Sequence, residues 1–458
     1  MNYVDFLLAP LYIFLLYLFF RSKRKKYASP LLQKYHRQGF WIKIFACILF
    51  ILYYSYLTVG DTTVLYQLEG NNLYHLILRD SSNFKYLFKS GKDFDLSLVA
   101  NRYNKGYFRD ESNFMVIRLD TLFSFISFGS YAVINLFFAA LAFSGLWKLY
   151  LFFYEQYPKL HKQFAISILY FPSLAFWSSG LLKDSLCIAA LGWLTYSLYS
   201  LLVKRKSVVK NCILIFIAGY FLGVLKIYIL LAYLPFFILF LLLKNVQNIK
   251  FKFFRYLFVP VIVALTVYSF TTFLSSYNDE LGGYAVEDLT SSISHLNQVI
   301  EDRSGREDAA SNFSLGEKFD GTFKGLIKIA PVAVATTFFR PFLWEAHKLS
   351  QLMAALESLI LMFFTGYVLL KGGIINFFTT IVTDPLIMYC FLFAVVFGLF
   401  IGASTLNFGT LVRYKIPCLP FYTIALFLIY EKAKERAAKK QSERQTPIKV
   451  ILLPGAVS

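Results

Sequence analysis

Long apolar runs recur from one end of the chain to the other, and they constrain the fold more than any other feature. Val4 to Phe20 is the first run, and several later runs are of similar length. A helix of about 20 apolar residues crosses the hydrocarbon core of a bilayer. Backbone groups in lipid must bond to one another, so such runs become helices. The sequence therefore predicts an all-α, polytopic transmembrane helical bundle.

The distribution of charge agrees with a membrane protein and argues against a nucleic-acid partner. Charged residues make up 16% of the 458 residues, against about 25% in soluble domains. The net charge is +19, but Lys and Arg cluster between the apolar runs, as a topology signal does. We therefore predict membrane lipids, and no nucleic acid, as partners.

We expect about eleven spans, with the N-terminus outside and the C-terminus in the cytoplasm. Segments assigned to the cytoplasm hold 26 Lys and Arg residues and 5 Asp and Glu residues. The two long periplasmic loops, 60–130 and 275–350, together hold 15 Lys and Arg residues and 19 Asp and Glu residues. This bias follows the positive-inside rule. A transmembrane domain over 1–431 and a basic cytoplasmic tail over 432–458 are predicted. The expected spans are 4–20, 40–59, 131–153, 164–180, 185–203, 212–225, 227–243, 256–274, 352–370, 385–403 and 415–431.

Residues 212–243 form one apolar stretch that only Lys226 interrupts. A single helix of this length would be about 48 Å long, well beyond the bilayer core. Both flanks are cationic, so two cytoplasmic ends and a hairpin are expected. Lys226 then tips the hairpin within the membrane depth, unless it snorkels toward the interface.

The outside segments predict short helices as well as loops. Residues 113–129 are amphipathic and are expected to lie along the membrane surface. Apolar residues recur at helical spacing in 286–303, and 304–322 is polar and predicts a loop. The apolar segment 323–341 contains Lys324, Lys328, Pro331 and Arg340, which favours a re-entrant or interfacial helix over a span.

With this topology, charged residues that are unusual for a membrane protein fall at the outer face. Five cations there suggest a shared anionic ligand, and the phosphate of a lipid carrier fits, because Arg binds phosphate bidentately and Lys adds a point charge. The expected phosphate-binding and substrate-binding residues are Lys183, Asp184, Lys226, Arg340, Glu345, Arg413 and Lys415, with His347 and Glu357 as further candidates.

Structural roles remain open for these residues. Arg340 can pair with Glu345 or Glu357 to hold two helices, since charges within membranes usually pair. Lys183 and Asp184 can form a solvated turn. Arg413 and Lys415 can contact lipid headgroups, and His347 and Glu357 can serve only in helix packing.

Asp61, in Val59-Gly-Asp-Thr-Thr63 after the second run, is the best candidate for a catalytic base. A hydroxyl that attacks an activated sugar must lose its proton, and a carboxylate within reach can accept it. Fixed cations then stabilise the departing phosphate. Asp61 can equally be the N-cap of a helix.

No motif for another chemistry was found. The five cysteines lie in or beside apolar runs without CxxC spacing, and the histidines show no metal-ligand spacing. The sequence contains no HExxH motif, P-loop, dinucleotide fingerprint or serine-nucleophile elbow. No cofactor or metal is therefore predicted, and a need for a divalent metal is left open.

An acidic residue at the start of a long outer loop, followed by amphipathic segments, resembles the layout of the C-type glycosyltransferase (GT-C) superfamily. The stretches PSLAFWSSGLLKDS, FFRPFLWEAH and NFGTLVRYKIP also look like those of bacterial membrane proteins in polysaccharide gene neighbourhoods. The resemblance covers roughly Trp41 to Tyr430. It implies a catalytic role for Asp61, a polyprenyl-phosphate sugar donor and a bacterial inner-membrane location. An additional first span and the lack of a second acid beside Asp61 depart from the pattern.

Three functions follow as hypotheses. The first is a periplasmic-face glycosyltransferase that uses a lipid-linked sugar in envelope polysaccharide or glycoconjugate assembly, alongside other polysaccharide-assembly proteins. The second is an O-antigen or exopolysaccharide polymerase that uses undecaprenyl-pyrophosphate-linked repeat units. The third is a transporter or flippase of lipid-linked anions, which the lack of an internal repeat disfavours.

Overall fold

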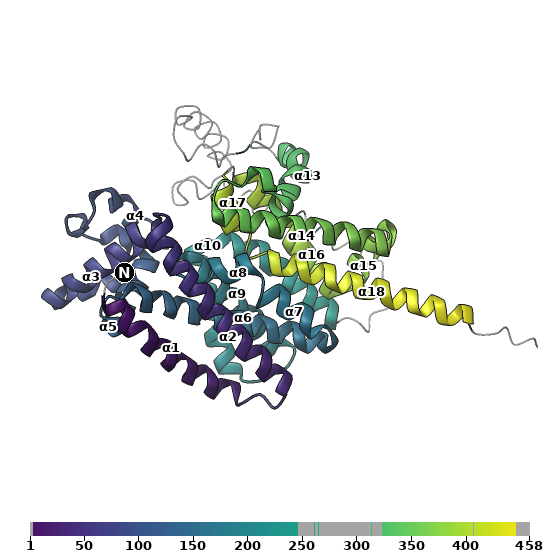
Figure 1. Cartoon of the computed structure of the whole chain (residues 1–458), viewed down its shortest axis with the longest axis horizontal. Helices are drawn as coiled ribbons and strands as arrows, with labels where there is room; N and C mark the ends of the chain where they lie inside the picture. The colour runs from purple at the N-terminus through teal and green to yellow at the C-terminus, as the bar shows by residue number, and fades with distance from the viewer. Residues whose placement is uncertain are drawn as a thin grey trace, which may run out of the picture.

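A computed structural model describes residues 3–245, 323–405 and 407–445, together with Val261, Ala264 and Phe313. Within these residues every element is an α-helix, a 3-10 helix or a π-helix, so the all-α prediction is confirmed there. The helices form a central bundle with a smaller lobe at one side (Figure 1). The predicted span 256–274, the periodic segment 286–303 and the loop 304–322 lie wholly or largely outside the described residues.

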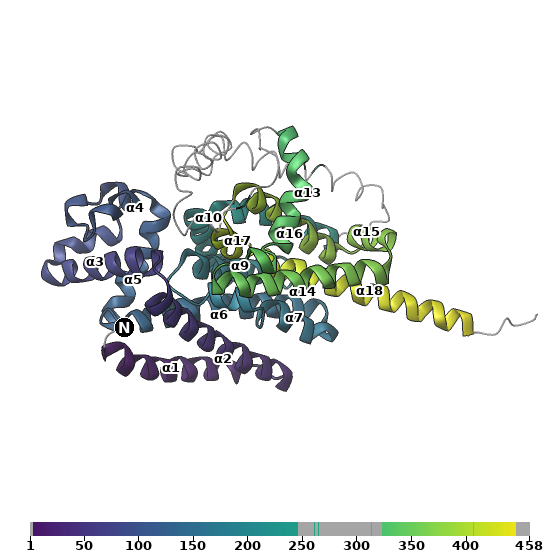
Figure 2. The same cartoon turned by 45° about the horizontal axis from the view of Figure 1, so that its top comes forward.

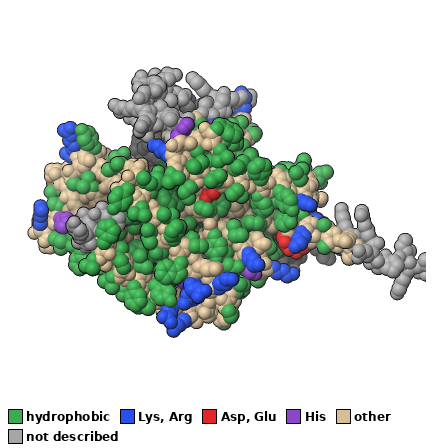
Figure 3. Space-filling model, in the orientation of Figure 1, with side chains coloured by type: hydrophobic (Ala, Val, Ile, Leu, Met, Phe, Trp, Pro, Cys, Tyr) green, Lys and Arg blue, Asp and Glu red, His purple; other side chains and the backbone are tan. Residues whose placement is uncertain are grey.

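The chain begins with a pair of apolar helices, α1 (Tyr3–Arg24) and α2 (Pro30–Leu52), which lie side by side in both views (Figures 1 and 2). Pro30 occupies the first position of α2, where the missing N–H group costs nothing. A π-helical turn, Tyr53–Leu57, extends α2. Hydrophobic side chains cover most of one face of the molecule, and Lys and Arg gather around the turn between α1 and α2 (Figure 3).

The lobe follows α2 and contains most of the first predicted outer loop. Its main elements are η2 (Thr62–Gln67), α3 (Leu68–Arg79), α4 (Lys105–Arg109) and α5 (Glu111–Ser127). Buried Glu69 accepts hydrogen bonds from the backbone N–H groups of Ala100 (2.9 Å) and Asn101 (3.0 Å) and from the Asn104 amide (2.8 Å). This one carboxylate therefore fixes the irregular chain before α4 against α3.

Residues 113–129, expected to lie along the membrane surface, form most of α5 and pack one face inside the lobe, so their placement at a membrane stays a prediction. Phe114, Val116 and Ile117 of α5 are fully buried, as are several of its polar residues. The hydroxyl group of Thr121 donates a hydrogen bond to the Gly70 carbonyl oxygen of α3 (3.1 Å). The amphipathic pattern is satisfied by packing against α3 and the bundle, and only the opposite face remains exposed.

Close packing of α6 (Tyr131–Gln156) against α9 (Lys183–Leu202) forms the centre of the bundle. A Cβ atom at Gly145 would lie 2.3 Å from the Ala189 carbonyl oxygen, and one at Gly192 would lie 2.0 Å from the Gly145 carbonyl oxygen. Small residues permit this close approach between helices in membranes.

Residues 164–180, predicted as one span, form two short helices, so that prediction is wrong. These are α7 (His161–Ile168) and α8 (Pro172–Trp177). Pro172 disfavours helical backbone at the preceding residue, and Phe171 is extended (φ −67°, ψ 116°). Further along, a Cβ atom at Gly180 would overlap the Phe50 ring (1.9 Å), so the chain passes close to α2 before α9 begins.

The chain reverses direction inside α10 (Val208–Asn245). Lys226, whose backbone is non-helical (φ −156°, ψ 73°), separates two helical arms. Lys204 precedes the first arm and Lys244 ends the second, yet both ammonium groups lie over the ring of Tyr199, at 5.7 and 5.2 Å from its centroid. A straight helix of 38 residues would be about 57 Å long and could not return to the same place. The predicted hairpin with Lys226 at its tip is therefore confirmed.

The C-terminal half packs around α16 (Pro385–Ser404). Its other helices are α13 (Phe323–Phe339), α14 (Leu349–Gly372), α15 (Ile374–Thr383), α17 (Phe408–Tyr414) and α18 (Leu419–Gln445). The expected span over 415–431 instead begins at a break, because α17 and α18 meet at 62°. The basic tail from Lys432 is helical and continuous with α18 as far as Gln445, and this helix projects from the bundle (Figures 1 and 2).

Seven described helices are long and apolar enough to cross a membrane, or eight if α17 and α18 count as one bent span. The seven include Val208–Lys244, counted as one helix although its two arms reverse direction. The count of eleven spans is therefore not confirmed. Helix α13 is among the shorter apolar helices, and its interfacial placement stays a prediction.

Candidate functional site

Asp184 lies in the first turn of α9 and joins two of the predicted cations. Its Oδ1 accepts a hydrogen bond from Lys226 Nζ at 2.6 Å, and its Oδ2 accepts one from Arg413 Nε. The side chains of Asp184 and Lys226 are 1% and 7% exposed, so the pair is buried. The alternative of a solvated Lys183–Asp184 turn is therefore wrong. The positive end of the α9 dipole further favours a carboxylate at this position.

Asp61 lies near a different nitrogen atom of the same guanidinium. Arg413 Nη1 lies 3.6 Å from Asp61 Oδ2, and the Asp61 side chain is 53% exposed. Asp61 occupies the N-cap position of η2, but its side chain makes no capping hydrogen bond. Its carboxylate therefore remains accessible, with Arg413 as its cationic neighbour. We refer to Asp61, Asp184, Lys226 and Arg413 as the Asp184 cluster.

Two tyrosines, Tyr414 and Tyr66, lie near the Asp184 cluster. The ammonium of Lys226 lies 4.0 Å from the centroid of the Tyr414 ring, an attractive cation–π geometry. Tyr66 of η2 is buried and donates a hydrogen bond to Asn113 Oδ1 at 2.8 Å. Burial raises the pKa of Tyr66, and the nearby Asp61 carboxylate raises it further. Lys226 thus contacts both a carboxylate and an aromatic ring that stabilise its positive charge.

Lys183 points toward the lobe and away from Asp184. Its Nζ lies 3.5 Å from Asp110 Oδ2 and 2.5 Å from the Ser112 hydroxyl. Asp110 also caps α5, accepting a hydrogen bond from the Ser112 backbone N–H at 2.9 Å. Lys183 therefore connects the start of α9 to the start of α5. Although it is next to Asp184 in sequence, it pairs with Asp110.

Arg340 and Glu345 form a local pair, as one of the open alternatives held. Arg340 Nε lies 3.1 Å from both carboxylate oxygens of Glu345, and Nη2 also bonds to Oε1. The Arg340 guanidinium lies over the rings of Phe313 and Phe408, at 4.7 and 5.1 Å from their centroids. The Arg340 side chain is consequently restrained by one carboxylate and two aromatic rings.

Lys415 connects α17 to the same region. Its Nζ donates hydrogen bonds to the Arg340 carbonyl oxygen (2.9 Å) and the Ser358 hydroxyl (3.0 Å). Glu357, next to Ser358, accepts from the backbone N–H of Ser173 (2.6 Å) and from the hydroxyl of the same residue. Glu357 thereby joins α14 to α8, and Lys415 joins the end of α17 to α14. Glu357 therefore has a role in helix packing.

His347 is exposed and lies apart from these contacts. Its backbone N–H donates to Gln351 Oε1 at 2.9 Å, at the start of α14. The predicted site residues therefore divide into the Asp184 cluster with Lys183 beside it, a second network around Arg340 and Lys415, and the separate His347. The five cations do not form one unpaired set, because Lys226, Arg340 and Arg413 already contact carboxylates.

Two polar contacts were not foreseen. Lys43 of α2, near the start of the expected span 40–59, is 3% exposed and bonds to the Ala175 carbonyl (3.2 Å) and the Ser178 hydroxyl (2.5 Å). A lone Lys inside an apolar run was the available signal. Asp110, the partner of Lys183, was one of many charges in a loop and had no distinguishing pattern.

Among the residues that the structure describes, no group of three or more His, Cys, Asp and Glu side chains is placed to hold a metal ion. The oxygen atoms of Asp61 and Asp184 contact Arg413 instead.

Comparison with known proteins leaves the glycosyltransferase resemblance as a prediction. No family model matches the chain, and neither a curated protein nor a solved structure matches it significantly.

Proposed function

We propose that this chain is a membrane glycosyltransferase that transfers a sugar from a lipid-linked phosphate donor to a hydroxyl acceptor. The observation that carries the proposal is the pairing of an accessible carboxylate, Asp61, with a guanidinium that a buried carboxylate holds in place. Arg413 is bound through Nε to Asp184 and approaches Asp61 at 3.6 Å through Nη1. A base and a phosphate-binding cation are thereby adjacent.

The two residues suit the two charges that develop during the reaction. The acceptor oxygen attacks the anomeric carbon and its proton passes to Asp61, while the bond from that carbon to the phosphate oxygen breaks. The electron pair leaves with the phosphate, whose negative charge Arg413 stabilises. Because Asp184 fixes Arg413, little reorganisation is needed when this charge appears.

The other predicted cations receive different roles in this proposal. Lys226 is a positioning residue, since it pairs with Oδ1 of Asp184 while Arg413 binds Oδ2. Lys183 lies near the start of α9 and supplies additional positive charge. Arg340 and Lys415 support α17, which carries Arg413, through the contacts of Lys415 with the Arg340 carbonyl and Ser358.

The excess of Lys and Arg in the segments assigned to the cytoplasm supports a site at the opposite, outer face. The hairpin tip at Lys226 and the cationic ends of the hairpin at Lys204 and Lys244 lie at opposite ends of α9. This arrangement supports a donor that reaches the site from the outer leaflet of a bacterial inner membrane.

The test is transfer of a radiolabelled sugar from synthetic polyprenyl-phosphate donors by the purified full chain in detergent. We expect Asp61→Asn to lower the rate about 10²- to 10⁴-fold, the usual contribution of a general base. Asp93→Asn, a change at an exposed carboxylate of the same lobe, should leave the rate unchanged. Full activity of the Asp61→Asn protein would remove Asp61 from the mechanism.

The products of the same reaction distinguish the two other hypotheses. A ladder of repeat units from a pyrophosphate-linked oligosaccharide indicates a polymerase. Movement of the lipid-linked sugar across liposomes without any turnover indicates a transporter.

A further inference from the structure

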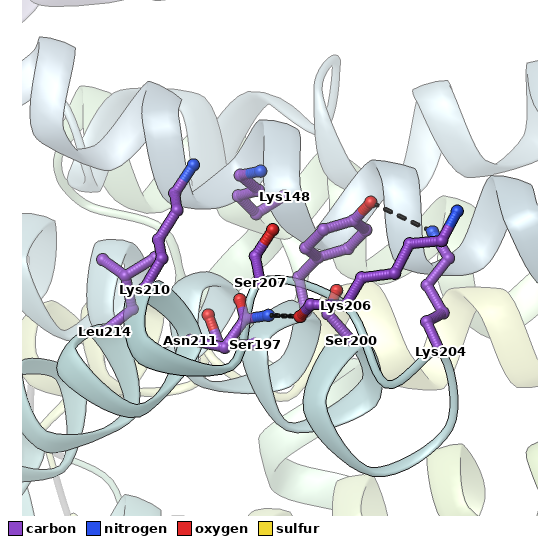
Figure 4. Close-up of a pocket in the computed structure, with 10 residues that line it drawn as sticks. Lys148, Ser197, Ser200, Lys204, Lys206, Ser207, Lys210, Asn211 and Leu214 are labelled. Carbon is purple, nitrogen blue, oxygen red and sulfur yellow. Dashed lines mark hydrogen bonds between the residues drawn. The ribbon is translucent and has the colours of Figure 1, made fainter.

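A second cationic site lies at the other end of α9, beyond the residues of the proposed reaction. A cavity of about 180 Å³ opens there between α6, α9 and the first arm of α10. Four lysines and several hydroxyl groups line it (Figure 4). Lys148 belongs to α6, Lys204 and Lys206 to the loop before α10, and Lys210 to α10 itself.

Three of the four lysines in this cavity form no ion pair with a carboxylate of the described residues. Lys204 pairs with Glu155 at 2.6 Å. Over the described parts of the chain, no carboxylate forms an ion pair with Lys148, Lys206 or Lys210. The half-buried Lys148 ammonium instead lies 4.5 Å from the centroid of the Tyr196 ring. Three like charges around one small cavity repel one another, and an anion would relieve that repulsion.

The lining also offers neutral hydrogen-bond donors. The hydroxyl groups of Ser197, Ser200 and Ser207 belong to the wall of the cavity, as does the Asn211 amide. That amide is oriented by its hydrogen bond to the Lys206 carbonyl (2.6 Å), which Figure 4 shows. Lysine ammonium and serine hydroxyl groups together suit the oxygens of a phosphate ester.

An exposed apolar surface begins directly beside the cavity. Val209, Ile213 and Phe216 of α10 are 75%, 54% and 76% exposed. They recur at i, i+4 and i+7, so they lie along one face of the first arm. The intervening residues Lys210, Asn211 and Leu214 line the cavity. A ligand with a phosphate at one end and hydrocarbon chains at the other would contact both surfaces.

We propose that this cavity binds the phosphate of an anionic phospholipid whose acyl chains lie along the exposed face of α10. Basic pockets between membrane helices at the cytoplasmic side are suited to anionic headgroups. The ligand class follows from the lysines, and the choice of a lipid over free phosphate follows from the adjoining apolar face. This site is independent of the Asp184 cluster.

Native mass spectrometry of the purified full chain, titrated with phosphatidylglycerol, tests the proposal. The variant Lys148→Met, Lys206→Gln, Lys210→Gln should bind phosphatidylglycerol about a hundredfold more weakly, since each lysine contributes about 1 kcal/mol near an anionic headgroup. The control variant Lys85→Gln, Lys89→Gln, Lys105→Gln removes the same charge from exposed positions of the lobe. It should bind as the unchanged protein does.

Further measurements distinguish a phospholipid from free phosphate, and a further variant controls for misfolding. Phosphatidylcholine should bind more weakly than phosphatidylglycerol, and millimolar inorganic phosphate should not displace the lipid. A variant with Lys206→Arg and Lys210→Arg keeps the charge and should retain binding. Equal loss in the control variant, equal binding of phosphatidylcholine, loss of binding in the arginine variant, or full displacement by inorganic phosphate would each overturn the assignment.

Discussion

Asp184 and Lys226 form a buried ion pair at 2.6 Å, although 42 positions separate them in the chain. The pair joins the first turn of α9 to the tip of the α10 hairpin. Arg413 completes the arrangement from α17, so one carboxylate holds three separate segments together. Removing one partner of a buried pair is costly because the remaining charge is then uncompensated.

Asp184→Asn is therefore expected to destabilise the protein by roughly 3–5 kcal/mol. Thermal unfolding of the purified protein in detergent measures this effect. The control Asp93→Asn should leave the midpoint unchanged, because that side chain is exposed. A double variant, Asp184→Asn with Lys226→Met, should recover part of the loss, and no recovery would argue against a pairwise interaction.

Arg413→Lys tests whether a guanidinium is needed between the two carboxylates. A lysine retains the charge but not the planar fork that contacts Asp184 through Nε and Asp61 through Nη1. We expect transfer activity to fall about tenfold or more, with a modest loss of thermal stability. Arg79→Lys, at an exposed site of the lobe, is the matched control. Unchanged kinetics in Arg413→Lys would show that a point charge suffices.

Asp120 of α5 predicts a pH dependence of stability. Its side chain is fully buried, and neither carboxylate oxygen has a hydrogen-bond partner among the described residues. Burial holds the pKa of this carboxyl well above its usual value of 3.8. The unfolded chain ionises first, so this group costs stability as pH rises above about 4, by about 1.4 kcal/mol per pH unit until the folded form ionises.

Asp120→Asn removes that ionisation at nearly constant size. The variant should gain thermal stability over the unchanged protein, and the gain should increase between pH 5 and pH 8. Melting curves at four pH values measure it, with Asp93→Asn as the control that should show no such trend. A constant difference at every pH would contradict a neutral buried carboxyl.

The contact between α6 and α9 predicts intolerance to a single methyl group. Gly192→Ala places a carbon 2.0 Å from the Gly145 carbonyl oxygen, so the backbones must separate. Overpacking of this kind costs about 1–3 kcal/mol, measurable as a lower melting temperature. Gly219→Ala on α10 meets nothing within 4 Å and should be neutral or slightly stabilising. Equal melting temperatures for the two variants would refute the close contact.

The sequence predicted best those features that depend on long-range patterns of hydrophobicity and charge. The all-α class and the hairpin at Lys226 followed from the length of the apolar runs and their cationic flanks. Local backbone chemistry escaped that reasoning. The division of residues 164–180 depends on Pro172 and on the approach of Gly180 to Phe50, and the latter contact is invisible without the fold.

The sequence predicted which residues belong to the candidate site better than it predicted which of them contact one another. Asp61, Asp184, Lys226 and Arg413 were all selected as unusual charges near one face, and they lie together. Their partners depend on the direction of each side chain. For this reason Lys183, next to Asp184 in sequence, contacts Asp110 on another element. The lysine cavity at the opposite end escaped notice because Lys148 lies inside an apolar run whose neighbours in space come from α9 and α10.

Arg413 and Lys415 are only two positions apart at the end of α17, yet they contact different parts of the molecule. Arg413 bonds to Asp184 at the start of α9, whereas Lys415 bonds to the Arg340 carbonyl that follows α13. Helix α17 has only seven residues, so the two contacts lie at the same end of one short, regular segment. Through these two contacts one short helix connects the start of α9 to the chain between α13 and α14.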